Sequence, residues 1–502
     1  MGGQSDDAPA HDSDLRRRGI RRRAWIGLLL WPVLTGPASG ASVEPAASSS
    51  DGLVAVRIDA RNAQRTIQAG PDAIGGIGDW ALQNGTLCAV VADPSHESDL
   101  STAGGGLVDL GFCGRDDDQF ILYQELLNNS LGDPVPAESV AAEIDARAAR
   151  LVVRGGRDGV AVETRYELDP ALPRRLRIET RVSRGRDAAK LYGFAGALAN
   201  VQSLTPFGAG LGSAAISRGY VHPSYADRGL SGISKAAVPA DLVVAVGAEE
   251  LQPGIAYGQR LVSVRLEDDT GKAVALPHFF LCDSLATVVA TFVRPFWIGD
   301  GSALGRVQML QTRLMNLAPG SRLVLEQEIW VGERADVASV TDLLWSDAPQ
   351  LVGRVDDARA VVHVDRATGE PVTQVRVGED GRFGVRLPAG NYRLRVGAPG
   401  GREVESTVSV AASAVDLGLL AVGPPARVTL PRNTPMRLVF LGIDGTLDPD
   451  FHDDLRGYAM SRDEGLRLVF EPERDVHLTG MSFDPPFVML RHLTLGISAS
   501  RS

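Results

Sequence analysis

The feature that most constrains this fold is the alternation of apolar and polar residues in short runs that Gly and Pro separate. It is clearest in residues 378–396 (GEDGRFGVRLPAGNYRLRV), where an Asp-Gly turn precedes the first of two alternating runs and a Leu-Pro-Ala-Gly turn joins them. Successive side chains of a strand point to opposite faces, so such runs predict half-buried β-strands. We expect these two runs to form adjacent strands of a small β-sandwich.

Similar runs dominate most of the chain, which we predict to be all-β. A large antiparallel sandwich is expected over residues 53–338, because most runs there alternate as half-buried antiparallel strands do. Helical patterns are few and are confined to residues 139–149 and 337–344. The predicted strands of the large sandwich contain residues 53–58, 86–91, 150–153, 160–166, 176–182, 261–266, 288–293 and 322–331.

The chain of 502 residues is long enough for several domains. Breaks in the pattern predict a linker at 42–52, the large sandwich at 53–338, a smaller β module at 350–423 and a partial β segment at 426–502. The last segment stops where a sandwich would need a further turn and strand. We therefore expect it to be truncated.

The N-terminal residues 1–41 are typical of an export signal. A basic stretch, Arg16–Arg23, precedes 13 apolar residues, Ala24–Gly36, and small residues follow. Thirteen residues make about 20 Å of helix, which is short of a ~30 Å hydrocarbon core. Cleavage near Gly40/Ala41 is favoured over a retained anchor. We expect a periplasmic or extracellular protein without a membrane span in its mature chain.

Charge and cysteine content restrict the partners. Acidic residues outnumber basic ones by 62 to 51, a formal net charge of −11. A polyanion partner, nucleic acid included, is disfavoured, because phosphate binding requires cations clustered on one face. Cys88, Cys113 and Cys282 form no metal or redox motif, and no cofactor is predicted. Three buried thiols are favoured over one disulfide and one free thiol.

Two polar segments are candidates for binding. Residues 116–118, three consecutive Asp, lack the ligand spacing of a calcium loop, so a solvated acidic loop is favoured. Residues 219–229 are the richest polar loop, although a surface loop without a ligand remains the simpler interpretation. Aromatic rings suit the C–H face of a sugar, and charged groups suit its hydroxyls. The candidate ligand-binding residues are Tyr220, His222, Tyr225, Asp227, Arg228 and, from a later strand, His278.

Acid–base chemistry on a sugar would need a His acid and a carboxylate base at opposed positions. His222 and His278 are candidates for the acid, and Glu326 or Glu328 for the base. No complete catalytic motif is present, and we predict neither a catalytic residue nor a metal ligand.

The module at 350–423 resembles the carboxypeptidase regulatory-like (transthyretin-like) domain. The matching pieces are Gly353–Val355, Gly369–Pro371, Asp380–Phe383 and Leu387–Tyr392. The resemblance implies a sandwich of seven strands without catalytic residues of its own. Phe383 and Tyr392 would be aromatic core residues beside tight turns.

The first module resembles the galactose-mutarotase-like supersandwich of sugar-binding and sugar-modifying proteins. The likeness rests on Gly78–Val91 and on Leu317–Gly320 leading into the strand Arg322–Val331. The whole order resembles the N-terminal part of exported PHP-type metallohydrolases, whose catalytic domain opens with a metal-binding His-x-His pair. This chain contains no His-x-His pair, so the hydrolase activity is not carried over.

These observations predict an exported, non-catalytic protein of several β-sandwiches. It would bind carbohydrate or an envelope polymer and support a catalytic domain that is missing here. One alternative is the N-terminal remnant of a PHP-type metallohydrolase. The other is a sugar epimerase- or lyase-like enzyme that uses the cleft of the supersandwich.

Overall fold

The computed structural model describes part of the chain. This part belongs to the second of two units, Met1–Pro45 and Ala46–Ser502. The predicted export signal and its cleavage site lie outside it. The described residues are 47–48, 52–96, 101, 103–128, 134–188, 191, 193–199, 204–208, 212–213, 237–238, 242–248, 254–276, 278–282, 286–292, 317–398, 402–424, 436–440, 467–469 and 497–501.

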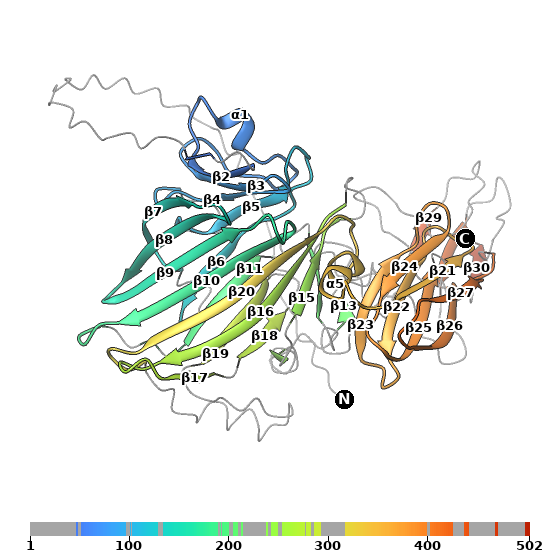
Figure 1. The fold of residues 1–502 in the computed structure, drawn as a ribbon. Helices are drawn as coiled ribbons and strands as arrows, with labels where there is room; N and C mark the ends of the chain where they lie inside the picture. The colour runs from blue at the N-terminus through green and yellow to red at the C-terminus, as the bar shows by residue number, and fades with distance from the viewer. Residues whose placement is uncertain are drawn as a thin grey trace, which may run out of the picture. The chain divides into compact units, whose positions relative to one another are not determined.

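The larger part of the structure consists of two ten-stranded antiparallel sheets, which we call the large sandwich (Figure 1). In the first sheet the order is β1-β2-β3-β4-β5-β6-β11-β19-β18-β14. Its strands are Ala47–Ser48 (β1), Leu53–Arg57 (β2), Trp80–Asn84 (β3), Leu87–Val91 (β4), Leu107–Phe112 (β5), Tyr123–Leu127 (β6), Gly193–Ala199 (β11), Ala237–Val238 (β14), His278–Cys282 (β18) and Ala286–Phe292 (β19).

The second sheet follows the order β13-β12-β15-β16-β20-β10-β9-β8-β7, with β17 paired to β16. Its strands are Ala137–Ile144 (β7), Ala149–Arg157 (β8), Val160–Leu168 (β9), Arg175–Arg184 (β10), Thr205–Gly208 (β12), Gly212–Ser213 (β13), Leu242–Val246 (β15), Ala256–Glu267 (β16), Ala273–Ala275 (β17) and Arg322–Gly332 (β20). The all-β fold class predicted from the alternating runs is confirmed.

A belt of polar side chains crosses the inside of the large sandwich. The Oε1 atom of Glu125, on β6, accepts hydrogen bonds from the hydroxyls of Thr164 (2.9 Å) and Thr180 (3.3 Å) on the opposite sheet. The Nε2 atom of Gln327 donates to the hydroxyl of Tyr123 across the same interior (2.7 Å). Apolar clusters fill the interior elsewhere. Every member of this polar belt is less than 6% exposed, so the core is polar at its centre.

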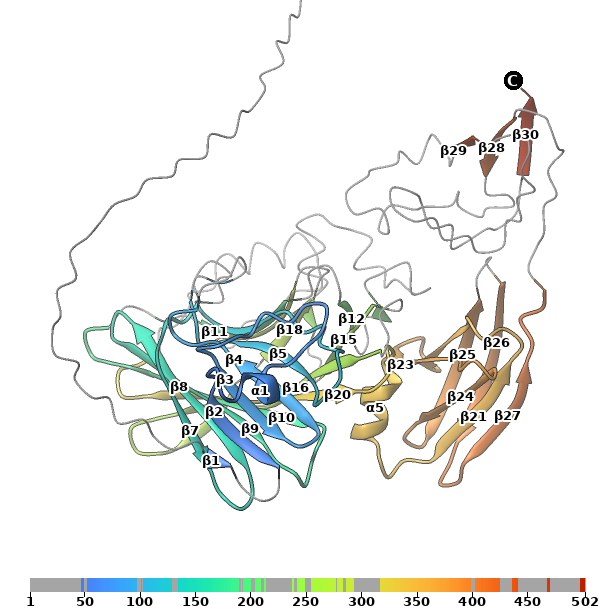
Figure 2. The ribbon, with the colours of Figure 1, turned by 90° about the horizontal axis from the view of Figure 1, so that it is seen from above.

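The strands of residues 350–420 form two further sheets, which we call the small sandwich (orange in Figures 1 and 2). The three-stranded sheet has the order β24-β21-β27, and the four-stranded sheet β23-β22-β25-β26. Seven strands are the number that the regulatory-like resemblance implies. They are Gln350–Val355 (β21), Val361–Arg366 (β22), Pro371–Arg376 (β23), Arg382–Arg386 (β24), Gly390–Ala398 (β25), Arg402–Val410 (β26) and Val415–Leu420 (β27).

The two runs of residues 378–396 are β24 and β25, and their predicted pairing as adjacent strands is wrong. Strand β24 pairs with β21, whereas β25 pairs with β22 and β26 in the other sheet. The Leu-Pro-Ala-Gly turn therefore crosses between the sheets. The hydroxyl of Tyr392 donates to the carbonyl of Pro388 in that turn (2.8 Å), while the ring lies in the apolar core beside Phe383 and other side chains.

The few helices are short. Residues Ala338–Leu344 form α5, close to the helix predicted at 337–344. The second predicted helix, 139–149, is wrong, because these residues form most of β7, a turn and the start of β8. Pairing with β8 outweighs the helical propensity of this Ala- and Glu-rich run, which lies at the edge of the sheet. Ala63–Thr66 forms α1, next to β2 and β3 in both views (Figure 2).

A third small sheet lies near the C-terminus, with the order β29-β28-β30. Its strands are Met436–Phe440 (β28), Arg467–Val469 (β29) and Ile497–Arg501 (β30). No helix among the described residues has the length and apolar character needed to cross a membrane.

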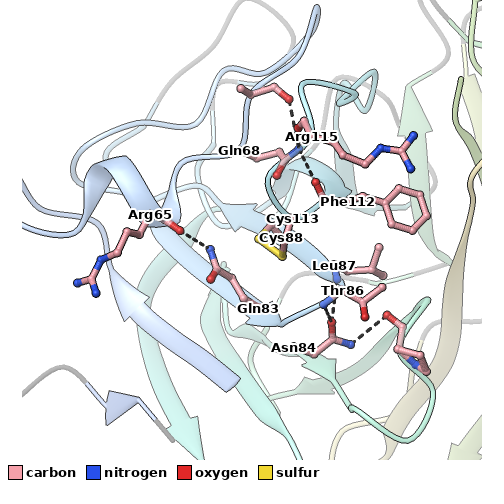
Figure 3. The surroundings of a disulfide bond; sticks show 12 residues. Arg65, Gln68, Gln83, Asn84, Thr86, Leu87, Cys88, Phe112, Cys113 and Arg115 are labelled. Atoms are coloured by element: carbon pink, nitrogen blue, oxygen red, sulfur yellow. Dashed lines mark hydrogen bonds between the residues drawn. A yellow bond between two sulfur atoms is a disulfide. The ribbon is translucent and has the colours of Figure 1, made fainter. Parts of the chain in front are cut away.

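A disulfide joins Cys88 on β4 to Cys113, just beyond β5 (Figure 3). The expectation of three buried thiols is therefore wrong for these two residues. They lie 25 residues apart in sequence, but antiparallel pairing of β4 with β5 brings their Cα atoms to 4.9 Å. Nearby, the side chain of Gln68 donates to the carbonyl of Arg115 (2.9 Å) and ties the preceding loop to this turn. Cys282 is the last residue of β18, and the structure does not describe its side chain.

Candidate functional site

Most of the residues that the sequence singles out for ligand binding lie outside the described residues. These are Tyr220, His222, Tyr225, Asp227 and Arg228. His278 is the first residue of β18 and pairs with Thr291 of β19, but its side chain is not described. The expectation that this loop binds a sugar therefore stays a prediction.

The two candidate bases of the late strand lie on the outer face of the second sheet, within ion pairs. Glu326 Oε1 lies 2.7 Å from a guanidinium nitrogen of Arg265. Burial raises the pKa of Glu326, but Arg265 and Arg177 outweigh burial and hold the pKa below its ordinary value. Glu328 lies between Arg175 (2.9 Å) and Arg260 (3.4 Å). The lowered pKa makes Glu326 a poor proton acceptor.

Residues 116–118 do not form the predicted solvated loop. Asp116 is exposed, but Asp117 and Asp118 are completely buried. Asp118 accepts hydrogen bonds from the backbone amides of Leu110 (3.2 Å) and Phe120 (2.9 Å), so it fixes the turn after β5. Burial and neighbouring Asp109 raise the pKa of Asp118 well above its ordinary value. Among the described residues no cluster of acidic, His or Cys side chains has the geometry of a metal site.

The described residues instead place a polar group at one edge of the first sheet. We call it the His96 site and define it as Arg57, Asp79, Trp80, Asp93 and His96. Arg57 ends β2 and Trp80 begins β3, directly opposite each other. Asp79 lies in the turn before β3, and Asp93 and His96 follow β4. Antiparallel pairing of three strands thus gathers residues from three separate stretches of chain.

The centre of the site is a contact between His96 and Asp79. Nδ1 of His96 lies 2.9 Å from both carboxylate oxygens of Asp79. The same carboxylate accepts backbone amides of Gly76 and Asp93, each at 2.9 Å, so its position is fixed. The side chain of Asp79 is 5% exposed and that of His96 is 23% exposed. An imidazole that donates Nδ1–H to a carboxylate keeps Nε2 as an acceptor.

Trp80 and Arg57 share Asp93 as a partner. Nε1 of Trp80 and a guanidinium nitrogen of Arg57 each lie 3.3 Å from the same oxygen of Asp93. Burial raises the pKa of Asp93, but hydrogen bonds from Ser95 and Trp80, with the charge of Arg57, hold it below its ordinary value. Trp80 is partly exposed and its Arg57 neighbour is 59% exposed. Part of the indole packs against the apolar core, and its exposed part lies beside charged groups at the surface.

A buried carboxylate lies beneath the site. Asp109, on β5, accepts hydrogen bonds from the backbone amides of Ile74 (2.8 Å) and Gly75 (3.0 Å). A Cβ atom on Gly75 would lie 2.4 Å from the Asp109 carboxylate, so the close approach requires glycine. Burial raises the pKa of Asp109 to about 6, with a further contribution from Asp79. Asp109 thus holds the loop that carries Asp79.

In the sequence, Trp80 was noted only within the stretch Gly78–Val91 of a family resemblance, and His96 was missed. The signal was weak, because Asp-x-x-His after a strand (Asp93, His96) is a common sequence. The partner of His96 lies 17 residues earlier, and its role depends on the pairing of β3 with β4. The arrangement can orient an imidazole, hydrogen-bond to hydroxyls and offer an aromatic ring.

Neither a protein-family model nor a curated protein sequence matches the chain. Similar solved structures include the galactose 1-epimerase of Lactobacillus acidophilus NCFM, at 12% identity, covering 51% of this chain and 94% of that one with a TM-score of 0.25. The Slr1438 protein of Synechocystis sp. PCC 6803 matches at 12% identity, with 51% and 96% covered and a TM-score of 0.27. Heparinase III matches at 8% identity, with 68% and 41% covered and a TM-score of 0.28. These values do not place the chain in a family.

Proposed function

We propose that the protein binds carbohydrate at the His96 site without transforming it. The observation that carries the proposal is that Trp80, Arg57 and His96 lie together at the surface, with Asp79 fixed by two backbone amides and Asp93 by Ser95, Trp80 and Arg57. The C–H face of a sugar ring packs on indole, and its hydroxyls accept hydrogen bonds from guanidinium and donate one to Nε2 of the imidazole. Because the loop is tied to Asp109 and Asp79, little ordering would be needed on binding.

The test is calorimetric titration of the full chain with a panel of oligosaccharides chosen from a glycan array. His96→Ala and Trp80→Ala should each weaken binding by about tenfold or more, the loss expected for a central aromatic or a charged hydrogen bond. Arg57→Ala is compared with Arg61→Ala, which removes an exposed Arg just outside the site. Absence of binding to every glycan, or equal losses in Arg57→Ala and Arg61→Ala, would contradict the proposal.

Export of the protein is part of the same proposal. The predicted signal in residues 1–41 supports it, and so does the disulfide between Cys88 and Cys113, because disulfides persist in oxidising compartments. Mass spectrometry of alkylated protein from the native cell envelope should find these two cysteines resistant to alkylation until reduction. Recovery of both as free thiols, in a cytosolic fraction, would contradict export. The regulatory-like resemblance further supports a role of the small sandwich in carrying a neighbouring domain.

A second candidate function is favoured by the contact of His96 with Asp79. A carboxylate that orients an imidazole through Nδ1 leaves Nε2 placed to transfer a proton, as in general acid–base catalysis. Under this alternative the protein would isomerise the sugar that it binds. Proton NMR of freshly dissolved α-sugars would detect it as accelerated anomerisation that His96→Gln abolishes. Rates equal to those in buffer would exclude the catalytic alternative and leave binding intact.

A further inference from the structure

The outer face of the second sheet of the large sandwich carries an unusual density of charge. We call the outward side of β8, β9, β10, β20 and β16 the arginine face. Figure 1 shows these strands side by side, and helix α5 packs against one end, where Val340 lies over Gly258. The outward charged residues are Arg150, Arg154, Glu163, Arg165, Glu167, Arg175, Arg177, Glu179, Arg181, Arg260, Arg265, Glu267, Arg322, Glu326 and Glu328.

These strands carry nine outward Arg and six outward Glu residues, an excess of three positive charges. If Glu143 of the edge strand β7 and Asp145, which lies 2.6 Å from Arg150, are included, the excess is one. The chain as a whole has a net charge of −11. This face therefore carries a small positive excess in an acidic chain, and its capacity to bind a polyanion depends on how far its guanidinium groups are exposed.

The carboxylates of this face lie deeper than most of the guanidinium groups. The six Glu side chains are 9–29% exposed, whereas six of the Arg side chains are 31–54% exposed. Five of the Glu residues each lie within 4 Å of two guanidinium groups; Glu179, for example, lies between Arg177 (3.2 Å) and Arg181 (2.6 Å). Solvent therefore meets mainly guanidinium groups, and the acids below hold them in place.

We propose that the arginine face binds an anionic polysaccharide, such as a polyuronate, through carboxylate–guanidinium pairs. The guanidinium fork matches a carboxylate in two parallel hydrogen bonds. Strands about 4.8 Å apart offer successive forks across an extended sheet, which suits a linear polymer that carries its charges at intervals. A duplex nucleic acid has one charge per about 1.7 Å, and the six Glu residues would repel it more strongly. This surface is separate from the His96 site.

The test is affinity electrophoresis of the full chain through gels that contain polygalacturonate. Methyl-esterified pectin serves as the matched polymer with reduced charge, and double-stranded DNA as the other polyanion. Wild type should be retarded by polygalacturonate, less so as salt is raised, and little by the esterified polymer. The double variant Arg177→Gln/Arg181→Gln should bind about tenfold more weakly or worse. The control Arg366→Gln/Arg382→Gln, on the small sandwich, makes the same change of charge and should bind as wild type does.

Four results would overturn the proposal. They are absence of retardation by polygalacturonate, equal retardation by the esterified polymer, an equal loss in the control variant, and stronger retardation by DNA than by polygalacturonate. Circular dichroism checks the fold of each variant. If the double variant does not fold, the single variants Arg154→Gln and Arg181→Gln, at positions 53% and 43% exposed, replace it. His96→Ala should not change the retardation, which keeps this test independent of the His96 site.

Discussion

The large and the small sandwich differ in what their interiors contain. The small sandwich has an apolar core of Leu, Val, Ala, Phe383 and Tyr392. The large sandwich buries Glu125 between its two sheets, Asp109 beneath the loop before β3 and Asp118 in the turn after β5, and burial raises the pKa of each. Buried ionisable groups lower stability unless they are hydrogen-bonded, and they concentrate near functional sites. The small sandwich also buries His363 and Asp365, on the side of β22 away from its apolar core, and burial raises the pKa of Asp365. The contrast therefore lies between the sheets, where the large sandwich holds the carboxyl of Glu125 and the small sandwich holds apolar side chains.

The comparison predicts that the small sandwich depends on a few apolar side chains. Phe383 is 5% exposed and packs among the core residues of both its sheets. Phe383→Ala should lower its free energy of unfolding by about 3–5 kcal/mol, because a cavity replaces a buried ring. Urea unfolding followed by Trp345 fluorescence would measure the loss, since Trp345 packs against this core. Leu419→Ala, at a site 63% exposed, is the control and should change little.

The buried carboxyl of Glu125 should make the stability of the large sandwich fall as pH rises. Burial raises the pKa of Glu125 from 4.5 to about 7, although Thr164 and Thr180 oppose the change. The protonated carboxyl of Glu125 leaves the folded state fully stable below pH 4.5, its pKa in the unfolded chain. Stability is then lost as pH rises to 7 and above, because this carboxyl ionises more readily in the unfolded chain than in the folded one. The loss should reach about 3 kcal/mol.

Thermal unfolding between pH 4.5 and 8 would detect this loss, and Glu125→Gln should flatten the pH dependence. In the small sandwich, Arg359 and Arg402 hold the pKa of Asp357 well below its ordinary value, so its stabilisation is lost as pH falls. Asp357→Asn is the matched control, because it should remove a part of the unfolding free energy that is lost as pH falls rather than as pH rises. An unchanged pH profile in Glu125→Gln would show that this carboxyl does not titrate in the folded core.

A smaller difference in the free energy of unfolding is expected between the loss of two buried tyrosine hydroxyls. Tyr123→Phe would leave the Nε2 group of Gln327 without its acceptor in the interior of the large sandwich, at a cost of about 2 kcal/mol. Tyr392→Phe removes a hydrogen bond to Pro388 that is partly accessible to water, so the cost should be about 1 kcal/mol. Denaturant titrations of both variants would measure the difference. Equal losses of unfolding free energy would mean that the polar belt is no more sensitive to a lost hydrogen bond than the turn of the small sandwich is.

Local sequence signals predicted the elements better than their partners. Alternation located eight of the twenty strands of the large sandwich, since period-2 burial is a local property, and a helical pattern located α5. The helical pattern failed at residues 139–149, where pairing with β8 decides the structure of an Ala-rich run. Alternation also paired the runs of 378–396 with each other, because turn residues do not specify whether a connection stays within one sheet.

The candidate sites were harder to predict, because each depends on long-range pairing. His96 meets Asp79, and Cys88 meets Cys113, through the registers of β3, β4 and β5. The arginine face was hidden by the opposite net charge of the whole chain. In each case the residue types were visible in the sequence, but their shared face was not.

The most direct test of carbohydrate binding at the His96 site is hydrogen–deuterium exchange with and without a bound oligosaccharide. We predict protection of the backbone amides of residues 74–80 and 93–96, with residues 350–420 of the small sandwich unchanged. Protection confined to residues 350–420, or no protection at residues 74–80 and 93–96 under saturating ligand, would contradict the account.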